Sequence, residues 1–210
     1  MADINTEKAV LRTEIITAAK VYKKELAGNV YLYVIGDEYF EVAYKTECFK
    51  HLTGVESPLS GKSFYNNAKN ATLTTAQISF NARHPLKTAK KKVVCLQQLP
   101  RLTQELVCAV KDLSTITITY KLGITNLEFT VGLTENLNTQ GVKINDWLIP
   151  RTLRVRDKSI ESSTDAEFVD FIFMKRVCDS KYTTLCYEEP KAFVPDCVRQ
   201  LLSDNLLPLS

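Results

Sequence analysis

Two histidines are the side chains of this sequence best suited to moving a proton near neutral pH. His51 lies in a short predicted helix that ends at Gly54. Because free backbone carbonyls at a helix end favour a charged ring, we expect a raised pKa of His51, which suits a general acid or base. A capping or core role is the alternative. His84 precedes Pro85, so we expect it in an exposed turn between helices.

Three side chains close to His51 in the sequence are further candidates for a catalytic role. Lys45 lies at the junction of a predicted strand and helix, where it could stabilise phosphate charge or simply be a solvated strand end. Thr53 could hydrogen-bond a phosphate oxygen, although capping of the helix end is slightly favoured. Cys48 would form a thiol and histidine pair with His51, but a cysteine in an apolar helix is usually a core residue.

Charge is unevenly spread along the chain. The formal net charge of +3 is too small to attract nucleic acid globally, so the position of each cation matters. Residues 81–101 hold six Lys or Arg and no acid, whereas residues 157–196 hold nine acids against five Lys or Arg. Within the basic part, Lys87, Lys90 and Lys91 either contact phosphates or form an ordinary solvated helix face.

Candidate substrate contacts also come from an arginine-rich strand and from one aromatic residue. Side chains two apart on a strand share a face, so Arg154 and Arg156 lie together and Arg151 does not. Arg154 is therefore a candidate phosphate contact, or an ordinary charged residue. Tyr65 could stack on a base, but its helical spacing favours burial.

The elements that position these residues change in kind along the chain. Helical patterns cover residues 4–26, 46–54, 60–71, a short stretch from Thr74 or Thr75, 86–98 and 102–110, with a hairpin at 30–35 and 39–44 after the first. Strand patterns follow at residues 115–122, 127–134, 142–148, 152–155, 167–175 and 182–188. Helices followed by strands predict an α+β fold with an antiparallel or mixed sheet.

We expect these elements to form a single domain over residues 1–210. Its parts are a helix and hairpin over 1–45, a helical middle over 46–112, a β-rich part over 113–190 and a short C-terminal helix over 195–205. An apolar content of 45% and a charged content of 24% are typical of a globular protein with a full core, and they exclude a disordered or low-complexity chain.

The sequence also predicts the location of the protein and whether it uses a cofactor or a metal. There is no apolar run long enough to span a membrane and no basic and apolar leader, so we expect no membrane association and a cytoplasmic protein. The six cysteines include no paired spacing, and we find no metal-binding pattern or phosphate-binding glycine loop. No cofactor or metal is expected.

Residues 39–55, which follow a helix ending at residues 22–26, resemble the phage-associated branch of the barnase, EndoU, colicin and RelE group of nuclease-like domains. Phe49 and the string His51-Leu52-Thr53-Gly54 carry this resemblance. Further family-like positions are Ser63-Phe64-Tyr65, Leu153-Arg154-Val155, Phe171-Ile172-Phe173 and Tyr182-Thr183-Thr184-Leu185.

The resemblance implies an RNase-like fold, with helices packed on an antiparallel sheet, in a protein of phages and prophages that acts in the host bacterial cytoplasm. Related folds cleave RNA without metal, by attack of the 2′-hydroxyl on its own phosphate. Such a reaction needs a base, an acid and cations. His51 is the best acid or base, and Lys45, Arg154 or Tyr65 would complete the set.

Two functions remain open at this point. The first is a ribonuclease or nuclease-like toxin with His51 as general acid or base. The second is a non-catalytic phage protein that binds a host protein, such as a defence component, or nucleic acid. The acidic region at residues 157–196 favours the second, because it would repel RNA but complement a basic host protein. The oligomeric state is not determined by the sequence.

Overall fold

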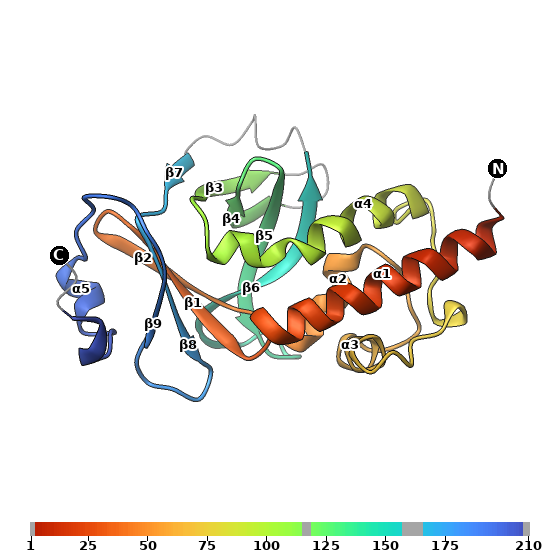
Figure 1. Ribbon diagram of the computed structural model, residues 1–210, viewed down its shortest axis with the longest axis horizontal. Helices are drawn as coiled ribbons and strands as arrows, with labels where there is room; N and C mark the ends of the chain where they lie inside the picture. Colours follow the sequence, from red (N-terminus) through yellow and green to blue (C-terminus); the bar gives the residue numbers. More distant parts are fainter. Residues whose placement is uncertain (1–2, 115–118, 157–165, 208–210) are drawn as a thin grey trace.

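The computed structural model describes residues 3–114, 119–156 and 166–207 (Figure 1). Its helices are α1 (Ile4–Glu25), α2 (Phe49–Thr53), α3 (Gly61–Lys69), α4 (Leu86–Gln97) and α5 (Asp196–Arg199). Its strands are β1 (Asn29–Ile35), β2 (Glu38–Ala43), β3 (Cys108–Ser114), β4 (Thr119–Thr125), β5 (Phe129–Leu137), β6 (Lys143–Val155), β7 (Ala166–Phe168), β8 (Phe171–Arg176) and β9 (Thr184–Glu188).

All nine strands of the described ranges belong to one strongly curled sheet (Figure 1). Their order is β7-β3-β4-β5-β6-β2-β1-β8-β9. Strand β2 runs parallel to β6, and the other neighbouring pairs are antiparallel. The α+β class with a mixed sheet is therefore confirmed, whereas the expectation of a single domain stays a prediction.

The first helix and hairpin form as their patterns predict. Helix α1 buries one apolar stripe, and Gly28, at φ +82°, leads the chain from the helix into β1. Gly36, at φ +53°, turns β1 into β2, whose residues pair in antiparallel register from Val30 with Ala43 to Ile35 with Glu38. The hairpin thus delivers the chain at Lys45 to the start of the candidate site.

The short helix that carries His51 also ends where its sequence predicts. A 3-10 turn at Thr46–Cys48 leads directly into α2, and Gly54 closes the helix in the left-handed region at φ +69°. The expected helix from Thr74 or Thr75 is only a 3-10 turn, Thr75–Gln77. Helix α3 is capped by the Ser60 hydroxyl, which accepts a hydrogen bond from the backbone N–H of Ser63.

The expected helix 102–110 is wrong. A 3-10 helix, Leu99–Thr103, occupies its start, and Cys108 already belongs to β3. In a short apolar run the helical and strand periods cannot be told apart, and pairing with β4 and β7 on both sides decides for the strand. The helical middle therefore ends earlier than residue 112. Part of the neighbouring expected strand 115–122 lies outside the described residues, and the rest belongs to β4.

The curl of the sheet follows from a very short connection between β7 and β8. The expected single strand 167–175 is split, so that β7 pairs with β3 at one edge while β8 pairs with β1. Only Val169 and Asp170 join them, and their backbone N–H groups donate to Val107 and Val34. Because six strands separate β7 from β8 in the sheet order, the sheet must bend round until β7 comes close to β8.

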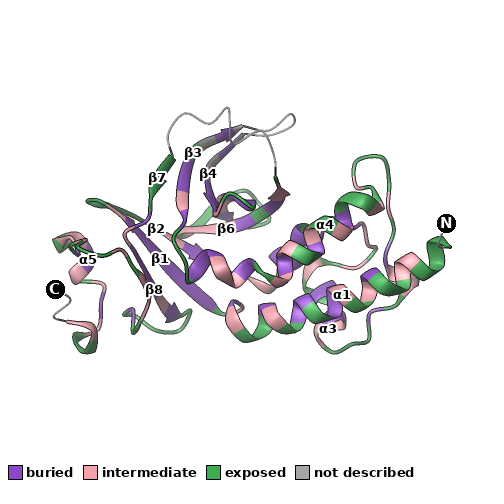
Figure 2. Ribbon diagram, turned by 45° about the horizontal axis from the view of Figure 1, so that its top comes forward, coloured by how far each residue is buried: buried purple, intermediate pink, exposed green. Residues whose placement is uncertain are grey.

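The sheet is buried on both faces along β1 (Figure 2). Tyr31 and Tyr33 belong to the main core, which also contains Tyr22 and Phe49 and is covered by the helices. The alternate residues of β1 face a second, smaller core under the C-terminal segment: Val30, Leu32 and Val34, with Tyr182, Val198 and Leu202. The main core fixes α2 against the sheet, and this contact creates the site described next.

Candidate active site where α2 meets β6

His51 on α2 faces Arg151 on β6. Arg151 Nη1 lies 3.1 Å from His51 Nε2. A guanidinium is always charged and can only donate, so Nε2 is the acceptor and the ring carries its proton on Nδ1. Both residues are exposed, which leaves the pair open to a ligand.

The pKa of His51 is lowered to about 4, and the expectation of a raised value is wrong. Partial burial of the ring is the largest cause, followed by the positive charges of Arg151 and Lys50. These terms outweigh the carbonyls at the end of α2, a single short turn with a weak dipole. The imidazole is therefore neutral at pH 7 and ready to accept a proton.

Arg151 reaches His51 because of a β-bulge. In the pairing of β5 with β6, Gly132 lies opposite Thr152 and Leu133 lies opposite Pro150, so Arg151 is the extra residue between them. A bulge bends its strand and re-aims one side chain, and proline is tolerated there because the ladder is already interrupted. The expected strands 142–148 and 152–155 thus form one strand, β6, through Pro150.

His84 and Glu56 form a second pair whose charges act on the same imidazole. His84 Nδ1 lies 2.5 Å from Glu56 Oε1, and both groups contribute to the pKa of His51. The Asn81 side chain accepts hydrogen bonds from the backbone N–H groups of Arg83 and His84, which holds this turn in place. The turn before Pro85 is thus as expected, but His84 is half-buried and not fully exposed.

Lys45 is held by a polar network that begins at a second irregularity of β5. The pairing with β6 shifts between Glu135 and Leu137, and the residue between them, Asn136, is buried. Asn136 accepts a hydrogen bond from Lys45 Nζ at 2.6 Å and donates one to Asn145 Oδ1 at 2.8 Å. The ammonium group is therefore fixed beside β5.

Cys48 lies buried between Lys45 and Arg151, whose charges both act on its thiol. Burial nevertheless raises the pKa of Cys48 to about 12. A thiol with this pKa is protonated at neutral pH and is a poor nucleophile. The structure thus gives no support to a thiol and histidine pair.

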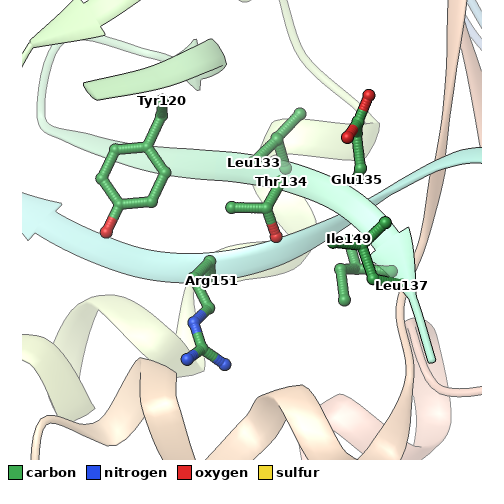
Figure 3. Close-up of a pocket in the computed structure, with 7 residues that line it drawn as sticks. All are labelled: Tyr120, Leu133, Thr134, Glu135, Leu137, Ile149 and Arg151. Atoms are coloured by element: carbon green, nitrogen blue, oxygen red, sulfur yellow. The ribbon is translucent and has the colours of Figure 1, made fainter. Parts of the chain in front are cut away.

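A hollow of about 430 Å³ opens beside Arg151, between β4, β5 and β6 (Figure 3). The residues that line it are Tyr120, Leu133, Thr134, Glu135, Leu137, Ile149 and Arg151. Figure 3 shows Tyr120 and Arg151 toward one end and Glu135 and Leu137 toward the other. Arg151 is the cationic residue among those that line the hollow.

Two of the residues singled out by sequence have structural contacts of their own. Thr53 is buried, and its hydroxyl donates to the Lys50 carbonyl at 2.7 Å, the capping arrangement. Tyr65 is 2% exposed and packs edge-on against Tyr22 and Phe49 in the core. Neither side chain is presented to a ligand in this structure.

The lysine-rich helix α4 packs against α2 and β6. Lys87 and Lys91 are exposed on it, while Lys90 pairs with Glu7 of α1 at 2.9 Å. Lys92 lies over the end of α2, since a Cβ on Gly54 would come within 2.7 Å of its Cδ. On the neighbouring β6, Arg154 is half-buried, at a paired position opposite Thr130.

The sequence singled out His51 and Lys45 as candidates but not the residues that the structure brings close to His51. Arg151 was set aside because strand alternation does not anticipate a bulge, although Pro150 beside it was a signal of one. His84 and Glu56 are brought near His51 only by the packing of a turn. Among the described residues, no cluster of three His, Cys, Asp or Glu side chains could hold a metal ion, and no helix is long and apolar enough to cross a membrane.

Imidazole and cationic side chains thus meet where α2 packs against β6, and such groups can serve acid–base and phosphate chemistry. The family model described as phage-Barnase-EndoU-ColicinE5/D-RelE like nuclease4 matches residues 14–191, and the chain belongs to this family. Membership in a nuclease family implies a nucleic-acid substrate. No curated protein and no solved structure shows significant similarity to the chain.

Proposed function

We propose that the protein is a metal-independent ribonuclease in which His51 is the general base and His84 the general acid. His51 Nε2 would take the proton of a ribose 2′-hydroxyl as that oxygen attacks the adjacent phosphorus. His84 would give a proton to the departing 5′-oxygen, leaving a 2′,3′-cyclic phosphate. The observation that carries the proposal is the neutral imidazole of His51 held against the guanidinium of Arg151.

Arg151 has two tasks in this scheme. Without substrate it occupies His51 Nε2, and with substrate it would turn its planar fork to the phosphate oxygens, for which a guanidinium has the matching geometry. That movement frees Nε2 for the 2′-hydroxyl and places a positive charge where the phosphorane becomes more negative. Lys45, positioned by Asn136, would add a second cation.

His84 supplies the second proton transfer, which the sequence assigned to Lys45, Arg154 or Tyr65. Glu56 Oε1 lies 2.5 Å from its Nδ1 without a hydrogen bond between them, so the carboxylate would hold the ring by charge when the ring is protonated. Tyr65 is unsuitable because burial raises its pKa and closes its hydroxyl off from substrate. Thr53 is left out of the machinery because its hydroxyl caps α2.

Flanking phosphates would lie along α4, where Lys87 and Lys91 are exposed, with Lys90 and Arg154 as further proposed contacts. Each lost phosphate contact lowers the salt dependence of binding by about one unit of slope. The proposed RNA path therefore joins the His51 site to the basic helix that packs beside it.

The test is cleavage of end-labelled RNA in EDTA by the wild type, His51→Ala, His84→Gln and the matched surface control Lys20→Ala. We expect cyclic-phosphate products, a loss of about 10²- to 10⁴-fold in both histidine variants and no change in the control. Circular dichroism checks that each variant is folded. RNA binding by the wild type without cleavage would contradict the proposal and favour the non-catalytic function. Capture of a host protein from nuclease-treated lysate by such an inactive protein would define that function further.

A further inference from the structure

We propose that the hollow beside Arg151 is a nucleobase subsite, which holds the base next to the cleaved phosphate and prefers bases that carry an exocyclic amino group. The inference rests on the proposed ribonuclease function, because Arg151 lines the hollow and is also the proposed phosphate contact. The volume of the hollow, about 430 Å³, falls in the range of roughly 300–1,000 Å³ typical of small-molecule sites.

The hollow shares a residue with the His51 site. Arg151 lines the hollow and also contacts His51 Nε2 at 3.1 Å. A phosphate drawn to this guanidinium would therefore have one neighbour at the imidazole and the other at the hollow.

The walls of the hollow combine apolar and polar side chains. Leu137 and Ile149 supply accessible apolar surface for the flat faces of a base, whereas Leu133 is fully buried. Two further lining residues of β5 are polar, Thr134 and Glu135. A nucleobase has this combination of apolar faces and hydrogen-bonding edge, whereas a phosphate or a metal ion does not.

The hollow is built into the strands that form it. Gly132 has no side chain, and a Cβ there would come within 3.0 Å of Tyr120 Cγ and 2.8 Å of Thr152 Cγ2. Tyr120 therefore lies directly on β5, with its ring as a wall of the hollow and only 5% exposed. Figure 3 shows its hydroxyl directed to the side on which Arg151 lies.

The base preference follows from Glu135. An ionised carboxylate only accepts hydrogen bonds, so it favours an edge that donates them. Adenine, cytosine and guanine carry an exocyclic amino donor, whereas uracil presents two carbonyl oxygens and a single N–H. Uracil should therefore bind least well.

The test is binding of the four nucleoside 3′-monophosphates and of inorganic phosphate to the full chain, measured by calorimetry. We expect the three amino-bearing nucleotides to bind at least fivefold more tightly than the uridine nucleotide, and Glu135→Gln to reduce that difference. Leu137→Trp fills the hollow from an exposed rim position and should weaken nucleotide binding at least tenfold while leaving phosphate binding unchanged. Ile144→Trp, an exposed position on β6 outside the hollow, is the matched control.

The subsite would be overturned if Leu137→Trp and Ile144→Trp bound every nucleotide as tightly as the wild type does. A loss in Leu137→Trp with no discrimination against uridine would keep the subsite and overturn the base preference. Because binding is measured without turnover, this experiment tests the nucleobase subsite separately from the ribonuclease function. Nucleotide binding by a protein that does not cleave RNA refutes only the ribonuclease function, and cleavage that Leu137→Trp leaves unchanged refutes only the subsite.

Discussion

Arg151 and His51 meet at 3.1 Å although one hundred positions separate them in the chain. The contact requires three local features at once: the short α2, its end at Gly54 and the bulge that makes Arg151 the extra residue of β6. Its consequence is a neutral imidazole whose acceptor nitrogen is covered by a cation.

Removing the charge of Arg151 should raise the pKa of His51. Arg151→Gln keeps a donor near Nε2 but deletes the positive charge, so protonation of the ring becomes easier. We expect the pKa to rise from about 4 but to stay below its ordinary value, because burial is the larger cause of the shift. NMR titration of the His51 ring protons measures it, with Lys20→Gln as control. An unchanged pKa in Arg151→Gln would show that the contact is absent in solution.

RNA cleavage should persist into mildly acidic solution and fall as the pH drops through about 4. Below that pKa His51 is protonated and cannot accept the 2′-hydroxyl proton, so kcat/KM decreases on the acid side. In Arg151→Gln the residual activity should begin to fall at a higher pH on the acid side, because the pKa of His51 is raised in this variant. A wild-type limb near pH 6.5 would mean that another group is the base.

The cysteines should differ sharply in reactivity. Cys48 is buried, and burial raises its pKa to about 12, whereas Cys178 is exposed. Brief treatment of the native protein with iodoacetamide at pH 8, followed by peptide mass mapping, should label Cys178 and leave Cys48 unmodified. RNA cleavage should be unchanged by this labelling. Rapid modification of Cys48 with loss of activity would restore the thiol mechanism.

Glu41 should matter for stability and not for cleavage. Its carboxylate accepts a hydrogen bond from the Tyr182 hydroxyl and lies 3.5 Å from Lys175 Nζ, which in turn lies 4.5 Å from the centre of the Tyr182 ring. Because Lys175 is 9% exposed, Glu41→Ala leaves a nearly buried charge without its carboxylate, and we expect a loss of about 3 kcal/mol in the free energy of unfolding.

Urea unfolding measures this loss, with Glu38→Ala on the same strand as the control. Glu38 is exposed and its contact with Lys111 spans 3.6 Å, so the control should change stability by less than about 1 kcal/mol. Equal effects of the two substitutions would show that the Glu41 cluster contributes nothing special.

Elements with strong local signals were predictable, and those decided by pairing were not. Helix α1, the hairpin and the end of α2 follow from apolar spacing and from glycines that adopt positive φ. The run 102–110 satisfies both periods, and its neighbours in the sheet make it a strand. The run 167–175 is continuous in pattern but is divided between two distant positions in the sheet.

The sequence by itself determined the α+β class, the family and the identity of His51 and Lys45 as candidates, because composition, local periodicity and a short motif are properties of neighbouring residues. Only the tertiary structure decided that Arg151, His84 and Glu56 act on the same imidazole, and that its pKa is lowered. The reason is physical: a bulge, a turn packed against α2 and partial burial are set by contacts between distant segments. Both the protonation state and the shape of the site follow from those contacts.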